Sequence, residues 1–116
     1  MGGDFLDNWA TQLRKGVLEF CILQVIARGD THGYDIVRTL RGIEGLMIAE
    51  GTVYPLLSRL RREGLIVSTI VESPQGPPRR CYRLTPKGAE LIRTMDRSWL
   101  ALARGVEQLR KGTHHG

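Results

Sequence analysis

Cationic side chains gather in the middle third of this sequence, where they could bind a polyanion. Residues 52–87 contain seven arginines and lysines against two acidic residues, whereas residues 1–51 contain five against seven and residues 88–116 five against three. The seven are Arg59, Arg61, Arg62, Arg79, Arg80, Arg83 and Lys87. Guanidinium and ammonium groups at this density suit the phosphates of a nucleic acid. Charge alone predicts a phosphate-binding surface and a solvated face about equally.

Residues that could support catalysis or hold a metal are scattered. His32 stands beside Gly33 without a plausible partner, and His114 and His115 end the chain without a cysteine or carboxylate beside them. Cys21 and Cys81 match no zinc spacing, so we interpret both as packed thiols and not as a redox pair. The sequence also lacks phosphate-loop and dinucleotide-binding motifs. We therefore expect no enzyme activity, no cofactor and no metal.

Length and composition favour one compact domain. The chain has 116 residues, of which 41% are hydrophobic and 25% charged, and its net charge is +5. A chain of this length can bury a core without disulfides. The apolar run at residues 17–27 is too short to cross a bilayer, and the N-terminus lacks the pattern of an export signal. We expect a cytoplasmic protein with no membrane partner, in which residues 1–3 and 111–116 are disordered.

Apolar residues at helical spacing predict three helices in the first part of the chain. A short amphipathic helix opens the fold, and a core helix follows at residues 17–27 with Gly29 as its stop. The next helix covers residues 32–40, with Asp30 and Thr31 as capping residues, and leads into a packed connector. The apolar residues behind these predictions are Phe5, Leu6, Trp9 and Leu13, then Ile36, Val37 and Leu40, then Ile43, Leu46 and Met47 in the connector.

The basic cluster begins in a further helix, predicted at residues 50–63 and stopped by Gly64. Its inner face consists of apolar residues at spacings of three and four. Pro55 removes one backbone donor, so we expect an irregular first turn or a bend. The inner-face residues are Val53, Leu56, Leu57 and Leu60.

A β-hairpin follows this helix in the sequence. The β-branched residues 65–71 predict one strand and residues 79–84 predict the returning strand. Between them, residues 73–78 contain three prolines and a glycine, which predicts a stiff six-residue tip. Arginines stand at the base of this hairpin.

The last predicted helix runs from Pro86, with Thr85 as its N-cap, to about Arg110. At 1.5 Å per residue it is roughly 37 Å long, which is more than so small a domain can cover. Its apolar stripe has heptad spacing, so we expect it to pack on another subunit. With one residue of the opening helix, the predicted dimer interface is Trp9, Ile92, Met95, Trp99, Leu102, Val106 and Leu109.

This order of elements predicts a mainly α (α+β) fold, a winged helix-turn-helix with a two-stranded β wing and a long C-terminal dimerisation helix. A major groove about 12 Å wide admits one helix with a polar outer face, as residues 50–63 provide. We divide the chain into a dimer-associated N-terminal helix (1–14), a DNA-binding domain (15–85), the dimerisation helix (86–110) and a tail (111–116).

Three segments form a set of motifs. Residues 50–65 read EGTVYPLLSRLRREGL, residues 33–36 read GYDI and residues 80–88 read RCYRLTPKG. Together they resemble the PadR family of transcriptional regulators over about residues 13–110. Similarity to its short members implies a homodimeric winged-helix repressor with a single C-terminal helix exchanged between subunits. One departure is Ala49, where the family often has a capping serine; the missing cap weakens the first helical turn by about 1 kcal/mol.

Eight residues are predicted to contact DNA. Thr52 and Tyr54 are the first choices in the recognition helix, and Arg79 and Arg80 in the wing would reach phosphates or the minor groove. Alternatives stay open: Tyr54 as a packing residue, Tyr34 as a core residue and the two wing arginines as solvated charge. Tyr82 is assigned to the core. The full set is Tyr34, Thr52, Tyr54, Ser58, Arg59, Arg62, Arg79 and Arg80.

Regulation and an alternative function complete the sequence-based hypotheses. Two recognition helices related by a dimer axis would lie about 34–36 Å apart, which predicts a palindromic operator. Trp99 either fills the dimer interface or, as the family resemblance implies, stacks a planar aromatic effector that releases DNA, with Glu19 and Phe20 as weaker candidates for the same space. The alternative is a winged-helix module that binds protein without binding DNA. Such a module would need an apolar, charge-poor face, whereas the exposed positions of residues 52–87 are rich in charge.

Overall fold

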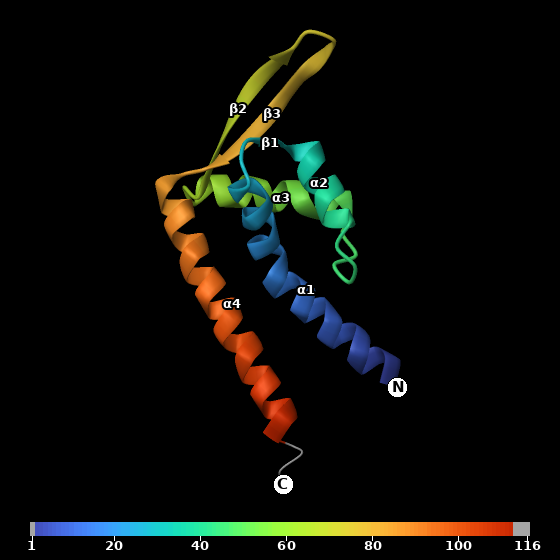
Figure 1. Cartoon of the computed structure of the whole chain (residues 1–116). Helices are drawn as coiled ribbons and strands as arrows, with labels where there is room; N and C mark the ends of the chain where they lie inside the picture. The colour runs from blue at the N-terminus through green and yellow to red at the C-terminus, as the bar shows by residue number, and fades with distance from the viewer. Residues whose placement is uncertain (1, 113–116) are drawn as a thin grey trace.

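The computed structural model describes residues 2–112, and Figure 1 shows how its helices and strands follow one another. In chain order the elements are α1 (Gly2–Ala27), β1 (Thr31–His32), α2 (Gly33–Arg41), α3 (Glu50–Arg62), β2 (Ile66–Ser73), β3 (Gly76–Leu84) and α4 (Pro86–Gly112). The hairpin β2–β3 stands out from the helices as the wing. This order confirms the predicted mainly α winged helix-turn-helix.

The hydrophobic core lies where the second half of α1 meets α2, α3 and the base of the wing. Ile22, Ile36 and Val53 are each completely buried, one from each of these three helices. The apolar faces predicted for α2 and α3 are therefore confirmed. In the connector the prediction is only partly right, because Leu46 is buried whereas Met47 is 78% exposed.

The two helices predicted at the start of the chain are one continuous helix, α1, of 26 residues. The predicted break falls near Gly16. This glycine is not required by close packing, because a Cβ atom at this position would meet nothing within 4 Å. A single glycine costs a helix only about 1 kcal/mol, and burial of the apolar residues that follow it offsets that cost. The predictions of disorder at residues 2–3 and at Lys111 and Gly112 are wrong, because these residues are helical. Met1 and residues 113–116 lie outside the described residues.

The predicted caps of α2 are also wrong. Thr31 and His32 form a short strand that pairs antiparallel with β3, so the sheet order is β1-β3-β2 and the wing gains a third strand at its base. His32 is the N-cap residue of α2 and makes no side-chain capping bond. Asp30 instead lies 3.3 Å from the Nε atom of Arg83. The backbone of Thr31 and His32 is thus paired with the edge of β3, and these residues do not act as side-chain caps.

The wing has a tighter tip than its prolines suggested. Ser73 pairs with Gly76, which leaves two residues in the turn in place of the predicted six, and a β-bulge follows Val71. Pro77 and Pro78 are part of β3. β1 pairs only with residues 81–82 of β3, so the edge of β3 at Pro77 and Pro78 is unpaired. A proline, which has no N–H to donate, is tolerated at such an open edge.

The start of α4 is fixed to the turn between α3 and β2. The Thr85 hydroxyl accepts a hydrogen bond from the Gly88 N–H at 3.0 Å and donates one to the Gly64 carbonyl at 2.6 Å, which confirms the predicted N-cap. Gly64 has a φ of +77° and ends the α3 segment as predicted. Gly88 is buried, and a Cβ atom there would collide with the carbonyl oxygen of Leu65. A side chain at this position would therefore push α4 away from the core.

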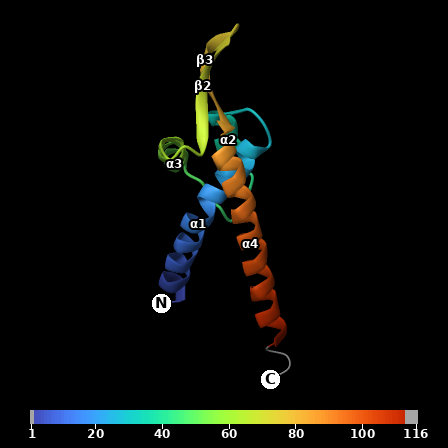
Figure 2. The same cartoon turned by 90° about the vertical axis from the view of Figure 1, so that its left-hand side faces the viewer.

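Two helical arms, residues 2–17 of α1 and residues 93–112 of α4, extend from the core away from the wing tip (Figures 1 and 2). The radius of gyration is 17.2 Å, whereas a compact domain of this length has about 13 Å. None of the helices in the described part of the chain is long and apolar enough to cross a membrane. The elongation places large apolar side chains of both arms in solvent.

Candidate nucleic-acid interface

α3 is anchored by a single buried face, which fixes the direction of every other side chain on it. Val53, Leu57 and Leu60 are at most 2% exposed and form this anchor. At 100° per residue, the remaining side chains divide into two flanks and an outer face. The wing flank consists of Tyr54, Ser58 and Arg61, the α1 flank of Thr52 and Arg59, and the outer face carries Arg62.

The wing flank and the wing enclose a cleft of about 280 Å³ that is rich in cations and hydroxyl groups. Arg80 of β3 donates a hydrogen bond from Nη1 to the Ser68 hydroxyl at 2.9 Å, and Arg61 of α3 approaches the same oxygen at 3.4 Å. Two guanidinium groups from different elements are thus brought to one side of α3. Arg61 was absent from the predicted contacts, although its spacing from Tyr54 and Ser58 places it on their side of a helix.

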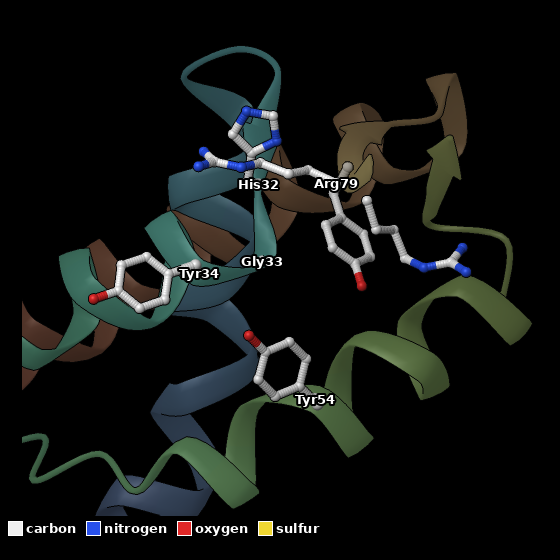
Figure 3. Close-up of a pocket in the computed structure, with 7 residues that line it drawn as sticks. His32, Gly33, Tyr34, Tyr54 and Arg79 are labelled. Carbon is white, nitrogen blue, oxygen red and sulfur yellow. The ribbon is translucent and has the colours of Figure 1, made fainter. Parts of the chain in front are cut away.

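A larger cleft of about 510 Å³ opens beside the first. It lies between α3, the start of α2 and the part of β3 from Arg79 to Tyr82. Figure 3 shows Tyr54 rising from α3 towards Gly33, with Arg79 reaching over from the wing. Tyr34, Arg80, Tyr82 and His32 complete the lining. Gly33 is needed for this closeness, because a Cβ atom there would lie 3.0 Å from the Tyr54 ring.

The three tyrosines around this cleft have different roles. Tyr82 is 7% exposed, as its assignment to the core predicted. Burial raises the pKa of Tyr82 while Arg80 and Arg61 oppose the rise, so the phenol stays neutral and able to donate. Tyr34 is 62% exposed with the Arg38 guanidinium 5.9 Å from its ring centre, which excludes the core alternative for it. Tyr54 is 39% exposed and both packs and faces solvent.

The α1 flank is arranged differently from the wing flank. The Arg59 guanidinium lies 3.3 Å from the Glu19 carboxylate of α1, so part of its charge is already compensated within the chain. Thr52 lines another cleft, shared with α1 and the connector. The predicted contacts are therefore not one cluster: Tyr34, Tyr54, Ser58, Arg79 and Arg80 surround the wing-side clefts, Thr52 and Arg59 lie on the opposite flank, and Arg62 points outwards.

His32 does have a partner, contrary to the sequence-based expectation. Its Nδ1 atom lies 3.0 Å from Sγ of Cys81, across the pairing of β1 with β3. Cys21 is partly buried in α1, and burial raises the pKa of its thiol. Within residues 2–112 no group of three or more histidine, cysteine or acidic side chains is placed to hold a metal ion. His114 and His115 lie outside the described residues.

Of the three residues predicted to bind an effector, Phe20 and Trp99 are in contact between α1 and α4. The Phe20 and Trp99 ring centres are 6.2 Å apart, with 41° between the ring planes. Glu19 points elsewhere, to Arg59. Along the predicted dimer stripe, Ile92 is buried in the core of its own chain, whereas Trp99, Leu102 and Leu109 are 43%, 64% and 72% exposed.

Comparison with known proteins identifies relatives of this architecture. The profile of the "Transcriptional regulator PadR-like family" matches residues 22–94. A transcriptional regulator of Mycobacterium tuberculosis is 33% identical over 97 residues, which cover 82% of this chain and 87% of the relative. These relatives are transcriptional regulators and not enzymes, in agreement with the interpretation of the sequence.

Solved structures share the fold. A PadR-like transcriptional regulator from Bacillus cereus is 38% identical and superposes with a TM-score of 0.77, covering 84% of this chain and 95% of that one. The structure of Bacillus subtilis PadR in complex with operator DNA is 27% identical with a TM-score of 0.59; the match covers 72% of this chain and 46% of that protein.

Proposed function

Because the chain belongs to the PadR-like family of transcriptional regulators, we propose that it binds DNA sequence-specifically, with α3 in the major groove and the wing on the adjacent backbone. The observation that carries the proposal is the convergence of Arg61 and Arg80 beside the exposed side of α3. Solvent-exposed guanidinium groups next to a helix with hydroxyl side chains provide both phosphate and base-edge contacts. The Bacillus subtilis relative, whose structure was solved with operator DNA, supports this use of the fold.

The working form is a homodimer that joins through the two arms. Phe5, Trp9 and Leu109 are more than half exposed, and solvent-exposed apolar surface on this scale marks an interface. A second copy supplies the same surface in return, which suits a twofold interface. Two α3 helices one DNA turn apart would then read a palindromic operator, at which the dimer acts as a repressor.

Release from DNA by a small planar effector belongs to the same proposal. The Phe20 and Trp99 rings contact each other between α1 and α4, at the junction of the core with the arms. A flat aromatic molecule stacked there would change the angle between the arms and hence the spacing of the two α3 helices. With Trp9 replaced by Phe, quenching of Trp99 fluorescence by planar aromatic compounds, paired with loss of DNA binding, tests this step.

Titration of duplex DNA at several salt concentrations tests the central proposal. Replacing Arg79 and Arg80 by alanine should weaken binding and lower the salt dependence of log K by about one unit for each lost phosphate contact. The Arg93→Gln/Arg97→Gln variant of α4 removes the same charge elsewhere and is the matched control. Unchanged affinity and slope in the Arg79/Arg80 variant would refute the wing assignment.

The alternative, a winged-helix module that binds protein only, makes a different prediction. Such a chain would show no salt-dependent affinity for any duplex. Selection of bound duplexes from a random pool settles the choice and yields the operator, since an enriched palindrome is expected only of a sequence-specific dimer. The exposed arginines on α3 and the wing favour DNA.

A further inference from the structure

Another basic cleft lies on the α1 flank of α3, on the side of this helix opposite to the two wing-side clefts. Its volume is about 200 Å³. α1 contributes one wall, the connector between α2 and α3 another, and the start of α3 the third. The lining residues are Thr11, Arg14, Lys15 and Leu18 of α1, Leu46, Met47, Ile48 and Ala49 of the connector, and Thr52 of α3.

The fold directs both cations of this cleft to the same side of α1. Arg14 and Lys15 precede Leu18 by four and three residues, so all three project to one side of α1. Leu18 is 6% exposed and fixes that side against the core. Arg14 is half-buried, and its Nη1 atom lies 3.8 Å from Sδ of Met47.

Neither Arg14 nor Lys15 takes part in an ion pair among the residues that the structure describes. Arg59, the arginine of α3 on the same flank, is instead paired with Glu19. Glu19 follows Lys15 by one helical turn, but its carboxylate is engaged by Arg59. The next acidic residue on this side of α1 is Asp7, two helical turns before Arg14. Arg14 and Lys15 are therefore the cations that the α1 flank can offer to an anion.

The geometry of the major groove calls for cations on both flanks. A helix about 10–12 Å across fills a groove about 12 Å wide, so one phosphate backbone runs along each side of it. Under the proposed function, Arg61 and Arg80, which both reach Ser68, would contact the backbone on the wing flank. The other backbone would meet the cleft at Thr52, where Arg14 and Lys15 stand.

We propose that Arg14 and Lys15 of α1 bind phosphates of the second DNA backbone, so that α3 is clamped between two basic clefts. This inference rests on the proposed function, which it deepens by assigning to α1 a direct contact with DNA. The contact reads no bases, because phosphates are the same in every sequence. It sets the depth and tilt of α3 in the groove.

The test is a titration of the full-length Arg14→Gln/Lys15→Gln variant with a random-sequence 30-base-pair duplex at several salt concentrations. Glutamine retains helix propensity, so α1 should stay intact, which circular dichroism checks. Affinity should fall about tenfold or more, and the salt slope should drop by about one unit for each lost contact. The charge-preserving Arg14→Lys/Lys15→Arg variant should restore both values.

Two controls separate this inference from the function on which it rests. The Arg93→Gln/Arg97→Gln variant loses the same net charge away from α3 and should keep the wild-type slope. If the Arg14/Lys15 variant also keeps it while the Arg79/Arg80 variant loses affinity, the clamp is wrong and DNA binding stands. If the wild-type protein itself binds no duplex, the proposed function fails and the clamp fails with it.

Discussion

The core and the two arms both have apolar side chains at helical spacing. They differ in whether other residues of the chain bury those side chains. In the core, Ile22 and Ile36 are completely enclosed by residues of their own chain. In the arms, Phe5 and Leu102 are 79% and 64% exposed. Burial of such a side chain stabilises a protein by about 1.5–3 kcal/mol, which a single chain does not gain from its arms. Apolar periodicity thus indicates that a helix face is to be buried. The fold decides whether the residues that bury it belong to the same chain.

The largest expected effect is in the core. Ile22→Ala removes a completely buried side chain and should lower the free energy of unfolding by about 2–5 kcal/mol, measured by urea denaturation. Leu102→Ala in the arm is the matched control and should change the stability of a dilute, dissociated chain by less than about 0.5 kcal/mol. If both variants lost the same free energy of unfolding at that dilution, the proposed difference between core and arm would be wrong.

The next effect concerns association of the arms. Trp99→Ala should weaken self-association by about 2 kcal/mol or more, because large aromatic residues near the centre of an interface contribute most to binding. Leu100 is 45% exposed against 43% for Trp99, yet it lies about a quarter-turn away on α4. Leu100→Ala should therefore alter the dimerisation constant much less, as sedimentation equilibrium would reveal. The reverse ranking would place the interface on another face.

The junction between core and arm should give an intermediate effect. Gly88→Ala forces a Cβ atom against the Leu65 carbonyl and should cost about 1–3 kcal/mol in stability. Gly105→Ala, on the exposed part of α4 where an added Cβ meets nothing within 4 Å, is its control and should be neutral or slightly stabilising. Thermal unfolding of the two variants compares them directly. A harmless Gly88→Ala would mean that α4 is not docked at this point.

The smallest effect is a loss of stability in alkali. The pKa of Tyr82 is raised from 10.0 by burial, so the folded protein holds this proton more tightly than the unfolded chain. The resulting stability is fully present below pH 10 and is lost as pH rises through the folded pKa. Tyr82→Phe should reduce this alkaline loss, which urea titrations at pH 8 and above pH 10 would measure. An identical pH dependence in both proteins would contradict the burial of this phenol.

Local patterns predicted α3 well and the contacts around it less well. Val53, Leu57 and Leu60 follow from spacing alone, and the Thr85 cap follows from the residue pair that it forms with Pro86. Arg59 and Arg61 look alike in the sequence, two positions apart. They differ because α1 offers Glu19 to one and β2 offers Ser68 to the other. No local pattern contains such a partner.

The sequence by itself determined the order of the elements from α2 to α4, the buried faces of α2 and α3 and the concentration of cations in α3 and the wing. These depend on residue type and on spacings within one element, which backbone geometry converts directly into faces. The tertiary structure alone decided that α1 is continuous, that β1 joins the wing, and that Arg14 and Lys15 stand beside Thr52. Such juxtapositions depend on how separate elements pack, because contacts between residues far apart in the chain are selected by the whole core and not by their neighbours in sequence.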